Sequence, residues 1–498
     1  MRQPLVAALI LALLLTSCAA RSPRAMRNTG ITVSSVVEQS RKDLQSLFNR
    51  TAIDHAHWAV HVVSLRSGET VYAQNALKLM VPASIQKLLT AAVAAERLGW
   101  DYRFTTRILA TGPIADGILD GDLIVSSNGD PTINPRDAGR WRAFDDWGAA
   151  LGAKGIRAVN GRVIGDDNAF EEPGWGIGWS WDDLQFGYGA AAAALQYNEG
   201  QVDVTVGPGL APGAPAIVMT SPPGHGIHVV NSVTTIAGDG ETRVGIGRLP
   251  ASNRLDVVGE IAAGSKPVTL TASAPNPTAL YVNALRDALA RQNVYVSAGT
   301  ADIDDVKPTP DTTKATELLV DHSPPLLDII DVALKWSRNE YAEGLLRAIA
   351  PPDQPASDRA GLEVMREQLR IMGVSPEQHL ARDGSGLSRM DLVSAEAMTT
   401  VLTYMWMDPK HADLFRSTLP VAGVSGTLAG RLKETPAENR VWAKTGTMSN
   451  VRALAGYLVT VAGEPMVFAI IVNNYRVPTA EIDATIDKAL IRLVQFQR

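Results

Sequence analysis

The chain has 498 residues, of which 46% are hydrophobic and 20% charged, and its formal net charge at pH 7 is -6. This length exceeds one compact core, so the sequence predicts two to four domains of ordinary folded composition. The sequence contains no basic block and no Arg/Lys stripe interleaved with aromatic residues, which argues against a nucleic-acid partner. The single cysteine excludes an internal disulfide and a cysteine-based zinc cluster.

The first twenty residues carry a secretion signal. Arg2 precedes an apolar run over residues 5–15, which is too short to serve comfortably as a membrane span. The run ends in Leu-Thr-Ser-Cys, which resembles the bacterial lipobox. We therefore expect residues 1–17 to be removed and Cys18 to be acylated, and each buried methylene would contribute about 0.8 kcal/mol to membrane anchoring. By resemblance to lipoprotein sorting, Ala19 favours the periplasmic side of the outer membrane; cleavage that leaves a soluble chain is the alternative.

Strand and helix patterns alternate in the first hundred residues. Residues 18–45 indicate a polar tether that enters a helix. Alternation from residue 58 predicts a strand, which is followed by a turn at residues 66–69 and a returning strand. Pro82 then opens an apolar helix. Residues 46–104 are therefore expected to form the first part of an α/β domain.

The composition changes between residues 105 and 309. Short Val/Thr-rich runs alternate there with Gly and Pro, which predicts a β-rich region with many hairpins, one helix over residues 277–292 and two nested subdomains. Helical patterns return over residues 310–498, where RALAGYLVTVAGEPMVFAIIVNN predicts two strands before a closing helix. We therefore expect a discontinuous α/β (α+β) domain that is built from both ends of the chain and carries a large β-rich insertion.

The helix after Pro82 contains the first motif with catalytic potential. Ser84 and Lys87 stand at positions i and i+3, which share one face of a helix, so the amine can reach the hydroxyl. Serine needs a base to take its proton, and lysine becomes that base where burial or a neighbouring cation favours its neutral form. Alone the motif is a weak signal, because Ser-x-x-Lys should occur about once by chance in such a chain. A solvated helix start is the alternative.

Two further motifs follow along the chain. Ser337 and Asn339 interrupt a long helical segment, where a hydroxyl and an amide can relay a proton and hold a peptide carbonyl; a helix kink or cap is the alternative. Lys444, Thr445 and Gly446 precede the terminal strands, where they can hold a carboxylate and admit a ligand backbone; a plain strand edge is the alternative. In this order the three motifs are the signature of penicillin-recognising serine acyl enzymes.

The chain resembles the low-molecular-mass class C penicillin-binding proteins, the D-alanyl-D-alanine carboxypeptidases/D-alanyl-D-alanine-endopeptidases of the penicillin-binding protein 4 type. The long interval between Ser84 and Ser337 leaves room for the insertion of that family. The motifs are VPASIQKLLTAA from Val81, SSNGDPTI from Ser126, HSPPL from His322, NEYAEGLL from Asn339, RDGSGLSR from Arg382, LPVAG from Leu419, GTLAGRL from Gly426 and AKTGTMSNVRALAGY from Ala443. Three positions depart from the family pattern: Arg338 and Asp391 replace a common Asn, and Ser425 a common acidic residue.

The resemblance implies a penicillin-recognising serine transferase fold, of the β-lactamase/transpeptidase-like type. It implies peptidoglycan stem peptides and cross-links as substrates and β-lactams as inhibitors, without a metal or an organic cofactor. Ser84 would be the nucleophile and Lys87 its base. Ser337 and Lys444 would pass a proton to the leaving amine, and Asn339 would orient Lys87. A homo-oligomer is compatible with the sequence.

Substrate-binding residues are also implied by the resemblance. In this chain they are Thr445, Gly446, Thr447, Met448, Ser449, Arg389, Trp179 and Asp182. Thr445 would take the terminal carboxylate, and the backbone of Thr447 would face the oxyanion. Arg389, Met448 or Ser449, and a Trp179–Asp182 pair would form a pocket for the third stem residue. For this last pair, an aromatic-rich packing loop is the alternative.

Three other functions are compatible with the sequence. One is a transpeptidase, although we expect hydrolysis to dominate. A β-lactamase would deacylate penicillin quickly, but no deacylating acid is identifiable, and the insertion favours peptidoglycan. A non-catalytic peptidoglycan-binding lipoprotein would keep the fold without the chemistry. Intact Ser84, Lys87, Ser337 and Lys444 argue against that reading.

Overall fold

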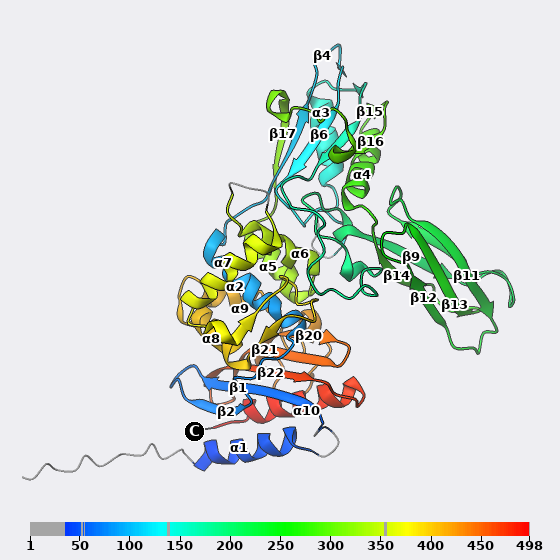
Figure 1. The fold of residues 1–498 in the computed structure, drawn as a ribbon. Coiled ribbons are helices and arrows are strands. Elements are labelled where there is room, and N and C mark those ends of the chain that lie inside the picture. Colours follow the sequence, from blue (N-terminus) through cyan, green and yellow to red (C-terminus); the bar gives the residue numbers. More distant parts are fainter. Residues whose placement is uncertain (1–34, 51–52, 54, 137–139, 353–355, 498) are drawn as a thin grey trace, which may run out of the picture.

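The computed structural model describes residues 35–498, except 51–52, 54, 137–139, 353–355 and 498. The predicted signal sequence and Cys18 lie outside these described residues. Figure 1 shows a body made from both chain ends and an inserted region, in cyan and green, that extends away from it. Within the described part of the chain, no helix combines the length and the apolar character that crossing a membrane requires.

A five-stranded antiparallel sheet forms the centre of the body. Its strands, in spatial order, are β2 (Thr70–Gln74), β1 (His57–Ser64), β22 (Pro465–Asn473), β21 (Val451–Val459) and β20 (Val441–Met448). β1 pairs with β22 along its whole length, so the two ends of the chain build one sheet. α1 (Ser35–Phe48) and α10 (Thr479–Val494) lie on one face of this sheet (Figure 1).

The predicted tether over residues 18–45 is wrong in its final part, because α1 begins at Ser35. Val37, Leu44 and Phe48 are buried in the core beneath the sheet. The ring of Phe48 lies 5.0 Å from that of Trp58 on β1. The sequence predicted that the tether enters a helix but not where the helix begins, because its apolar residues are few and its packing on α10 stabilises it.

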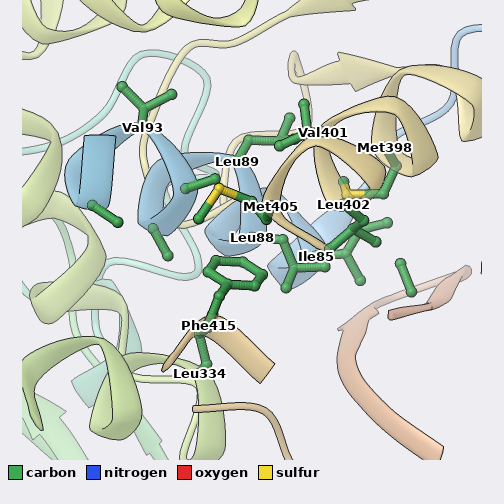
Figure 2. Close-up of a cluster of buried hydrophobic side chains, with 14 of the residues drawn as sticks. Ile85, Leu88, Leu89, Val93, Leu334, Met398, Val401, Leu402, Met405 and Phe415 are labelled. Carbon is green, nitrogen blue, oxygen red and sulfur yellow. The ribbon is translucent and has the colours of Figure 1, made fainter. Parts of the chain in front are cut away.

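A second layer of helices, opposite α1 and α10, covers the other face of the sheet. It encloses α2 (Gln86–Leu98), the helix that begins two residues after Ser84. Its helices are α2 (Gln86–Leu98), α5 (Leu326–Lys335), α6 (Asn339–Ala348), α7 (Asp358–Ile371), α8 (Ala395–Met407) and α9 (Ala412–Ser417), with the short strands β18 (His379–Leu380) and β19 (Leu392–Val393). Figure 2 shows Leu88 and Leu89 of α2 packed among Val401, Met405 and Phe415. Because α2 is buried on nearly every side, the motif at its start is held on a rigid element.

The inserted region contains an α/β unit and a β unit. The first has β3 (Thr105–Ala110), β6 (Leu123–Ser127), β8 (Val163–Asp166), β16 (Thr300–Asp302), β17 (Thr316–His322), α3 (Ala143–Ala153), α4 (Pro277–Arg291) and the small strands β4 (Ile114–Ala115), β5 (Ile118–Leu119), β7 (Ala158–Val159) and β15 (Tyr295–Val296). The second has β9 (Gln201–Gly207), β10 (Ile217–Ser221), β11 (His228–Ile236), β12 (Arg243–Gly247), β13 (Arg254–Ala262) and β14 (Val268–Ser273). The first unit differs from the predicted hairpins, since β8 pairs in parallel with β6 and β16. α3 was missed because it is short and glycine-containing.

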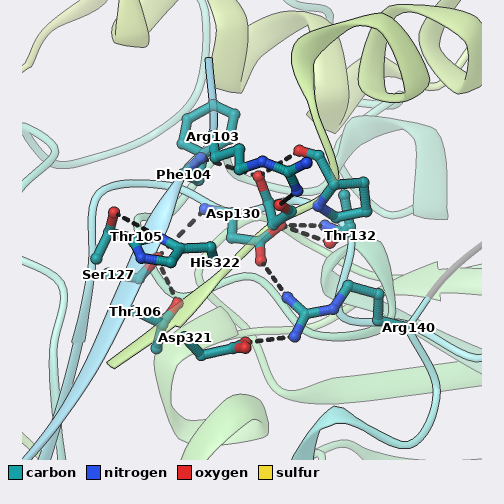
Figure 3. A network of polar contacts seen from close by, with 12 residues as sticks. Arg103, Phe104, Thr105, Thr106, Ser127, Asp130, Thr132, Arg140, Asp321 and His322 are labelled. Carbon is teal, nitrogen blue, oxygen red and sulfur yellow. Dashed lines mark hydrogen bonds and ion pairs between the residues drawn. The ribbon is translucent and has the colours of Figure 1, made fainter. Parts of the chain in front are cut away.

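The inserted region closes later than the predicted residue 309, because β17 pairs antiparallel with β3. Figure 3 shows the polar network that joins the two strands at this point. Buried Asp130 accepts hydrogen bonds from Thr132, with its N–H at 2.9 Å and its hydroxyl at 2.7 Å, and pairs with Arg140 at 3.1 Å. Arg140 also pairs with Asp321 of β17. The SSNGDPTI motif is therefore explained by this junction rather than by the reaction.

Candidate active site

Ser84 lies in a single turn of 3-10 helix, η2 (Ala83–Ile85), directly before α2. Ala83 has a φ of 49°, a left-handed conformation that costs an L-residue about 1–2 kcal/mol and turns the chain sharply at this point. Lys87, in the first turn of α2, donates to the Ser84 hydroxyl, with Nζ 3.1 Å from Oγ. The structure thus brings together the two residues that the sequence paired.

Lys87 is held by two further acceptors. Its Nζ lies 2.6 Å from Oδ1 of Asn339 and 2.8 Å from the carbonyl oxygen of Ser385. The side chain is buried, and burial lowers the pKa of Lys87 to about 8 against the opposing charges of Asp383 and Glu343. A neutral amine is therefore accessible near neutral pH, which is what a general base requires.

The Ser-x-Asn motif occupies a break between two helices. α5 ends at Lys335, Ser337 adopts a left-handed conformation with a φ of 62°, and α6 begins at Asn339. The Ser337 hydroxyl accepts a hydrogen bond from Nζ of Lys444 at 2.8 Å. The amide of Asn339 donates to the carbonyl oxygen of Tyr188 in the inserted region at 2.7 Å. This break therefore aims two polar side chains at the start of α2.

β20 carries the Lys-Thr-Gly motif past the serine. A Cβ on Gly446 would lie 2.7 Å from the carbonyl oxygen of Pro82 and 3.2 Å from the backbone nitrogen of Ser84, so only glycine permits this approach. Lys444 is fully buried, and burial together with the charge of Lys87 holds its pKa well below the usual range. The two amines thus disfavour each other's protonation.

These residues surround a cavity of about 240 Å³. Its lining consists of Ser84, Asp183, Tyr188, Ser337, Asn339, Gly386, Leu387, Arg389, Thr447, Met448 and Ser449. The guanidinium of Arg389 donates to the carbonyl oxygen of Ser449 at 3.3 Å, which closes one side. A larger groove of about 830 Å³ beside β2 and α8 contains none of the predicted catalytic residues.

The predicted pair Trp179–Asp182 does not line this cavity. Nε1 of Trp179 donates instead to Oδ2 of Asp383 at 2.8 Å, and Asp182 is exposed. Asp183 and Tyr188 take that place, and the Tyr188 hydroxyl donates to Oδ1 of Asp183 at 2.8 Å. The sequence could not decide which of two adjacent aspartates faces inward, because loop conformation decides it.

Thr445 and Gly446 lie beside the cavity rather than in its lining. The Thr445 hydroxyl donates to the hydroxyl of Thr427 at 2.9 Å, in the 3-10 turn η8 (Gly426–Leu428). Sequence reasoning missed Thr427, although the GTLAGRL motif that contains it was a signal. Thr447 is hydrogen-bonded through its hydroxyl to Arg452, so its side chain is fixed at the cavity edge.

One group of possible metal ligands lies among the described residues, namely Glu96, Asp408 and His411. Trp100 donates to Nδ1 of His411 at 3.1 Å, so the neutral imidazole carries its proton on Nε2. That nitrogen faces Oε1 of Glu96 at 3.1 Å. A protonated nitrogen has no lone pair for a metal, and we interpret the group as a buried polar contact.

The chain is similar to several known carboxypeptidases. Over 471 residues, the chain is 33% identical to the D-alanyl-D-alanine carboxypeptidase of Actinomadura sp., covering 92% of this chain and 84% of that protein. It is 29% identical to the D-alanyl-D-alanine carboxypeptidase DacB of Haemophilus influenzae, covering 87% and 88%. The crystal structure of penicillin binding protein 4 from Haemophilus influenzae superposes with a TM-score of 0.78 at 27% identity, covering 91% of this chain and 99% of that one.

A second crystal structure of that protein, in complex with a β-lactam, gives a TM-score of 0.74 at 26% identity, covering 92% of this chain and 100% of that one. These similarities confirm the predicted resemblance and the predicted penicillin-recognising fold. Residues 40–495 match the profile of one family over nearly the whole described chain. The chain therefore belongs to the D-Ala-D-Ala carboxypeptidase 3 (S13) family of serine peptidases.

Proposed function

We propose that this S13 peptidase hydrolyses peptidoglycan stem peptides that end in D-Ala-D-Ala through an acyl enzyme on Ser84. The same chemistry applies to D-amino-acid cross-links. The observation that carries the proposal is the contact of 3.1 Å between Nζ of Lys87 and Oγ of Ser84, made by an amine whose pKa burial lowers to about 8. A buried amine in this position is a base aimed at one hydroxyl.

In the first step, the neutral amine of Lys87 takes the proton of Ser84 as Oγ attacks the substrate carbonyl. The oxyanion that develops is stabilised by the backbone N–H groups of Ser84 and Thr447, because Gly446 brings β20 against the serine turn. Preorganised donors of this kind contribute about 3 kcal/mol each. Asn339 holds the amine in place throughout.

In the second step, the leaving amine needs a proton. The Ser337 hydroxyl, to which Lys444 is hydrogen-bonded at 2.8 Å, passes a proton to it, and the proton that Lys87 took from Ser84 restores this relay, so that Lys87 is neutral again. Thr445 donates its hydroxyl to that of Thr427, and when a substrate binds, this pair can turn a hydroxyl toward the terminal carboxylate. Water then hydrolyses the ester on Ser84, and the same groups take the proton of the water and return a proton to Ser84.

The cavity wall fits a particular kind of stem side chain. Asp183 and Arg389 both line the cavity and carry opposite charges. A side chain that ends in both an amine and a carboxylate would pair with them in a complementary way. Met448 and Leu387 add apolar surface for its methylenes. We assign this pocket to the third residue of the stem peptide.

The test is the intact mass of the chain without residues 1–18 after brief exposure to benzylpenicillin, beside a Ser84→Ala variant. A persistent single adduct that the variant lacks is the expected result. Rapid drug hydrolysis without an adduct would indicate a β-lactamase instead. No adduct, intact drug and no cleavage of a D-Ala-D-Ala peptide would indicate a binding protein and contradict the proposal.

We also propose that Cys18 carries a lipid anchor in the periplasm, on the basis of the Leu-Thr-Ser-Cys pattern. In a bacterial expression host, the full-length chain should partition into the detergent phase, and Cys18→Ser should remain aqueous. Equal partitioning of both proteins would contradict the anchor, without any bearing on the catalytic proposal.

A further inference from the structure

A tight loop over residues 381–391 lies beneath the amine of Lys87. Gly386 has a φ of 81°, and a Cβ there would overlap the carbonyl oxygen of Ala83. Gly384 packs closely on α6, where a Cβ would lie 2.7 Å from the carbonyl oxygen of Ala342. The loop is therefore wedged between the nucleophile turn and the helix that carries Asn339.

Two buried carboxylates hold the backbone of this loop. Oδ1 of Asp383 accepts the N–H of Gly386 at 2.7 Å, and its Oδ2 accepts the N–H of Ser388 at 2.6 Å. Oε1 of Glu343 accepts the N–H groups of Gly384 at 3.0 Å and Ser385 at 2.8 Å. Charge-assisted bonds of this kind are stronger than neutral ones, so three successive amides have fixed directions.

The peptide bond between Ser385 and Gly386 links Asp383 to Lys87. In a trans peptide, the N–H and the C=O groups point in opposite directions. Because the N–H of Gly386 points at Asp383, the carbonyl of Ser385 points away from it, toward the amine of Lys87 at 2.8 Å. Rotation of this peptide would break both bonds at once. The direction of the acceptor for Lys87 is therefore set by Asp383.

The inserted region reaches the same carboxylate. Nε1 of Trp179 donates to Oδ2 of Asp383 at 2.8 Å. The Ser388 hydroxyl of the loop donates to the carbonyl oxygen of Ile177 at 2.7 Å, and Ile177 lies two residues before Trp179. Neither Trp179 nor Asp383 lines the substrate cavity. Their contacts therefore connect the insertion to the catalytic amine and not to the substrate.

We propose that Asp383 and Trp179 are positioning residues for the general base: Asp383 orients the Ser385 carbonyl that holds the amine of Lys87, and Trp179 fixes Asp383 from the inserted region. This inference rests on the proposed function, because it takes Lys87 as the base of acylation. It gives the insertion a part in catalysis besides forming a wall of the side-chain pocket.

The charges around Asp383 predict how the base responds to its loss. Lys87 on α2, Glu343 on α6 with its partner Arg347, and Asp391 on the loop face this carboxylate. Burial lowers the pKa of Lys87, and Asp383 is the foremost charge that opposes this shift. Burial and Asp383 raise the pKa of Asp391 well above its usual range. Removal of the Asp383 charge should lower the pKa of Lys87 further.

The first test is Trp179→Phe, which removes one hydrogen bond and keeps an aromatic ring. Trp175→Phe is the matched control, since Trp175 lies in the same loop and is 39% exposed. The rate constant for acylation by a β-lactam should fall about tenfold for Trp179→Phe, as expected when a catalytic group is slightly misplaced. KM for a D-Ala-D-Ala peptide should stay unchanged, and Trp175→Phe should match the wild type.

The second test is Asp383→Asn, with Glu464→Gln as the control for replacing a buried carboxylate by an amide. Glu464 is buried in the turn between β21 and β22, where it accepts from the Ser64 hydroxyl at 2.6 Å. Asp383→Asn should slow acylation about tenfold or more at high pH. The pH at which the acylation rate of Asp383→Asn falls off on the acid side should also be lower than in the wild type. Loss of structure alone does not produce this change.

Wild-type acylation that depends on Ser84 is the reference, so its absence would count against the proposed function and not against this inference. The inference is overturned if Trp179→Phe acylates within twofold of the wild type across the pH range. It is also overturned if the losses only follow a fall in the unfolding midpoint, with the pH profile unmoved. Should Asp383→Asn not fold, Trp179→Phe decides alone.

Discussion

The central sheet and the outer β unit of the insertion use strands of equal length in different ways. β22 and β11 both have nine residues, but eight positions of β22 are buried against two of β11. Helices cover both faces of the central sheet, whereas the outer strands alternate between core and solvent. The catalytic residues therefore lie on a rigid frame, by which we mean the central sheet and the helices that cover its two faces. The insertion, in contrast, reaches the site through loops and turns, among them those around Trp179, Asp183 and Tyr188.

The largest expected effect separates a lysine of the frame from a lysine of the insertion. Lys87→Met keeps the volume of the side chain and removes the base, so acylation by a β-lactam should slow about 10³-fold. Lys154→Met removes an exposed amine from the inserted region and should leave the rate unchanged. Stopped-flow measurement of acylation checks both variants. A fast Lys87→Met enzyme would show that another group activates Ser84.

The second prediction places the same truncation in each region. Leu454→Ala in β21 and Leu255→Ala in β13 both remove a fully buried side chain, and each should lower the free energy of unfolding by about 3 kcal/mol. Only Leu454→Ala should also slow acylation, because β21 pairs with β20 beside the site. Urea unfolding and acylation rates measure the two effects. Equal slowing by both variants would abolish the distinction between frame and insertion.

The third prediction concerns the close approach of β20 to the serine turn. Gly446→Ala would place a Cβ 2.7 Å from the carbonyl oxygen of Pro82, so β20 must move away from Ser84. A displacement of this order costs about 10²-fold in rate. Gly430→Ala is the control, because no atom lies within 4 Å of its Cβ position. Acylation of Gly446→Ala at the wild-type rate would show that the close approach of β20, which carries the Thr447 N–H, is not needed for the oxyanion site.

The smallest expected effect is the dependence of the wild-type enzyme on pH. Burial lowers the pKa of Lys87 to about 8, and only the neutral amine accepts the proton of Ser84. The neutral fraction is about one tenth at pH 7 and about nine tenths at pH 9, so the acylation rate should rise about tenfold over this range. A flat profile from pH 6 to 9 would contradict Lys87 as the titrating base.

Local patterns made part of this molecule predictable. The spacing of Ser84 and Lys87 places them on one helical face whatever surrounds them. In the same way, the spacing of Lys444 and Gly446 places them on one face of a strand. Asp183 was missed in favour of Asp182, and Trp179 was placed in the pocket, because loop conformation depends on contacts with distant segments. The start of α1 could not be placed from the sequence because the helix is stabilised by α10, which lies more than 400 residues away.

The long-range pairing of β1 with β22 also has a consequence for folding. β1 acquires its central neighbour only when the last residues of the chain are available, since β22 ends at Asn473. Contacts of such high sequence separation form slowly, because a long loop must close before they contribute. Asn473 also exchanges hydrogen bonds with the backbone of Val81, directly before the serine turn. A partly folded chain would therefore hold an assembled insertion long before it could react with a β-lactam.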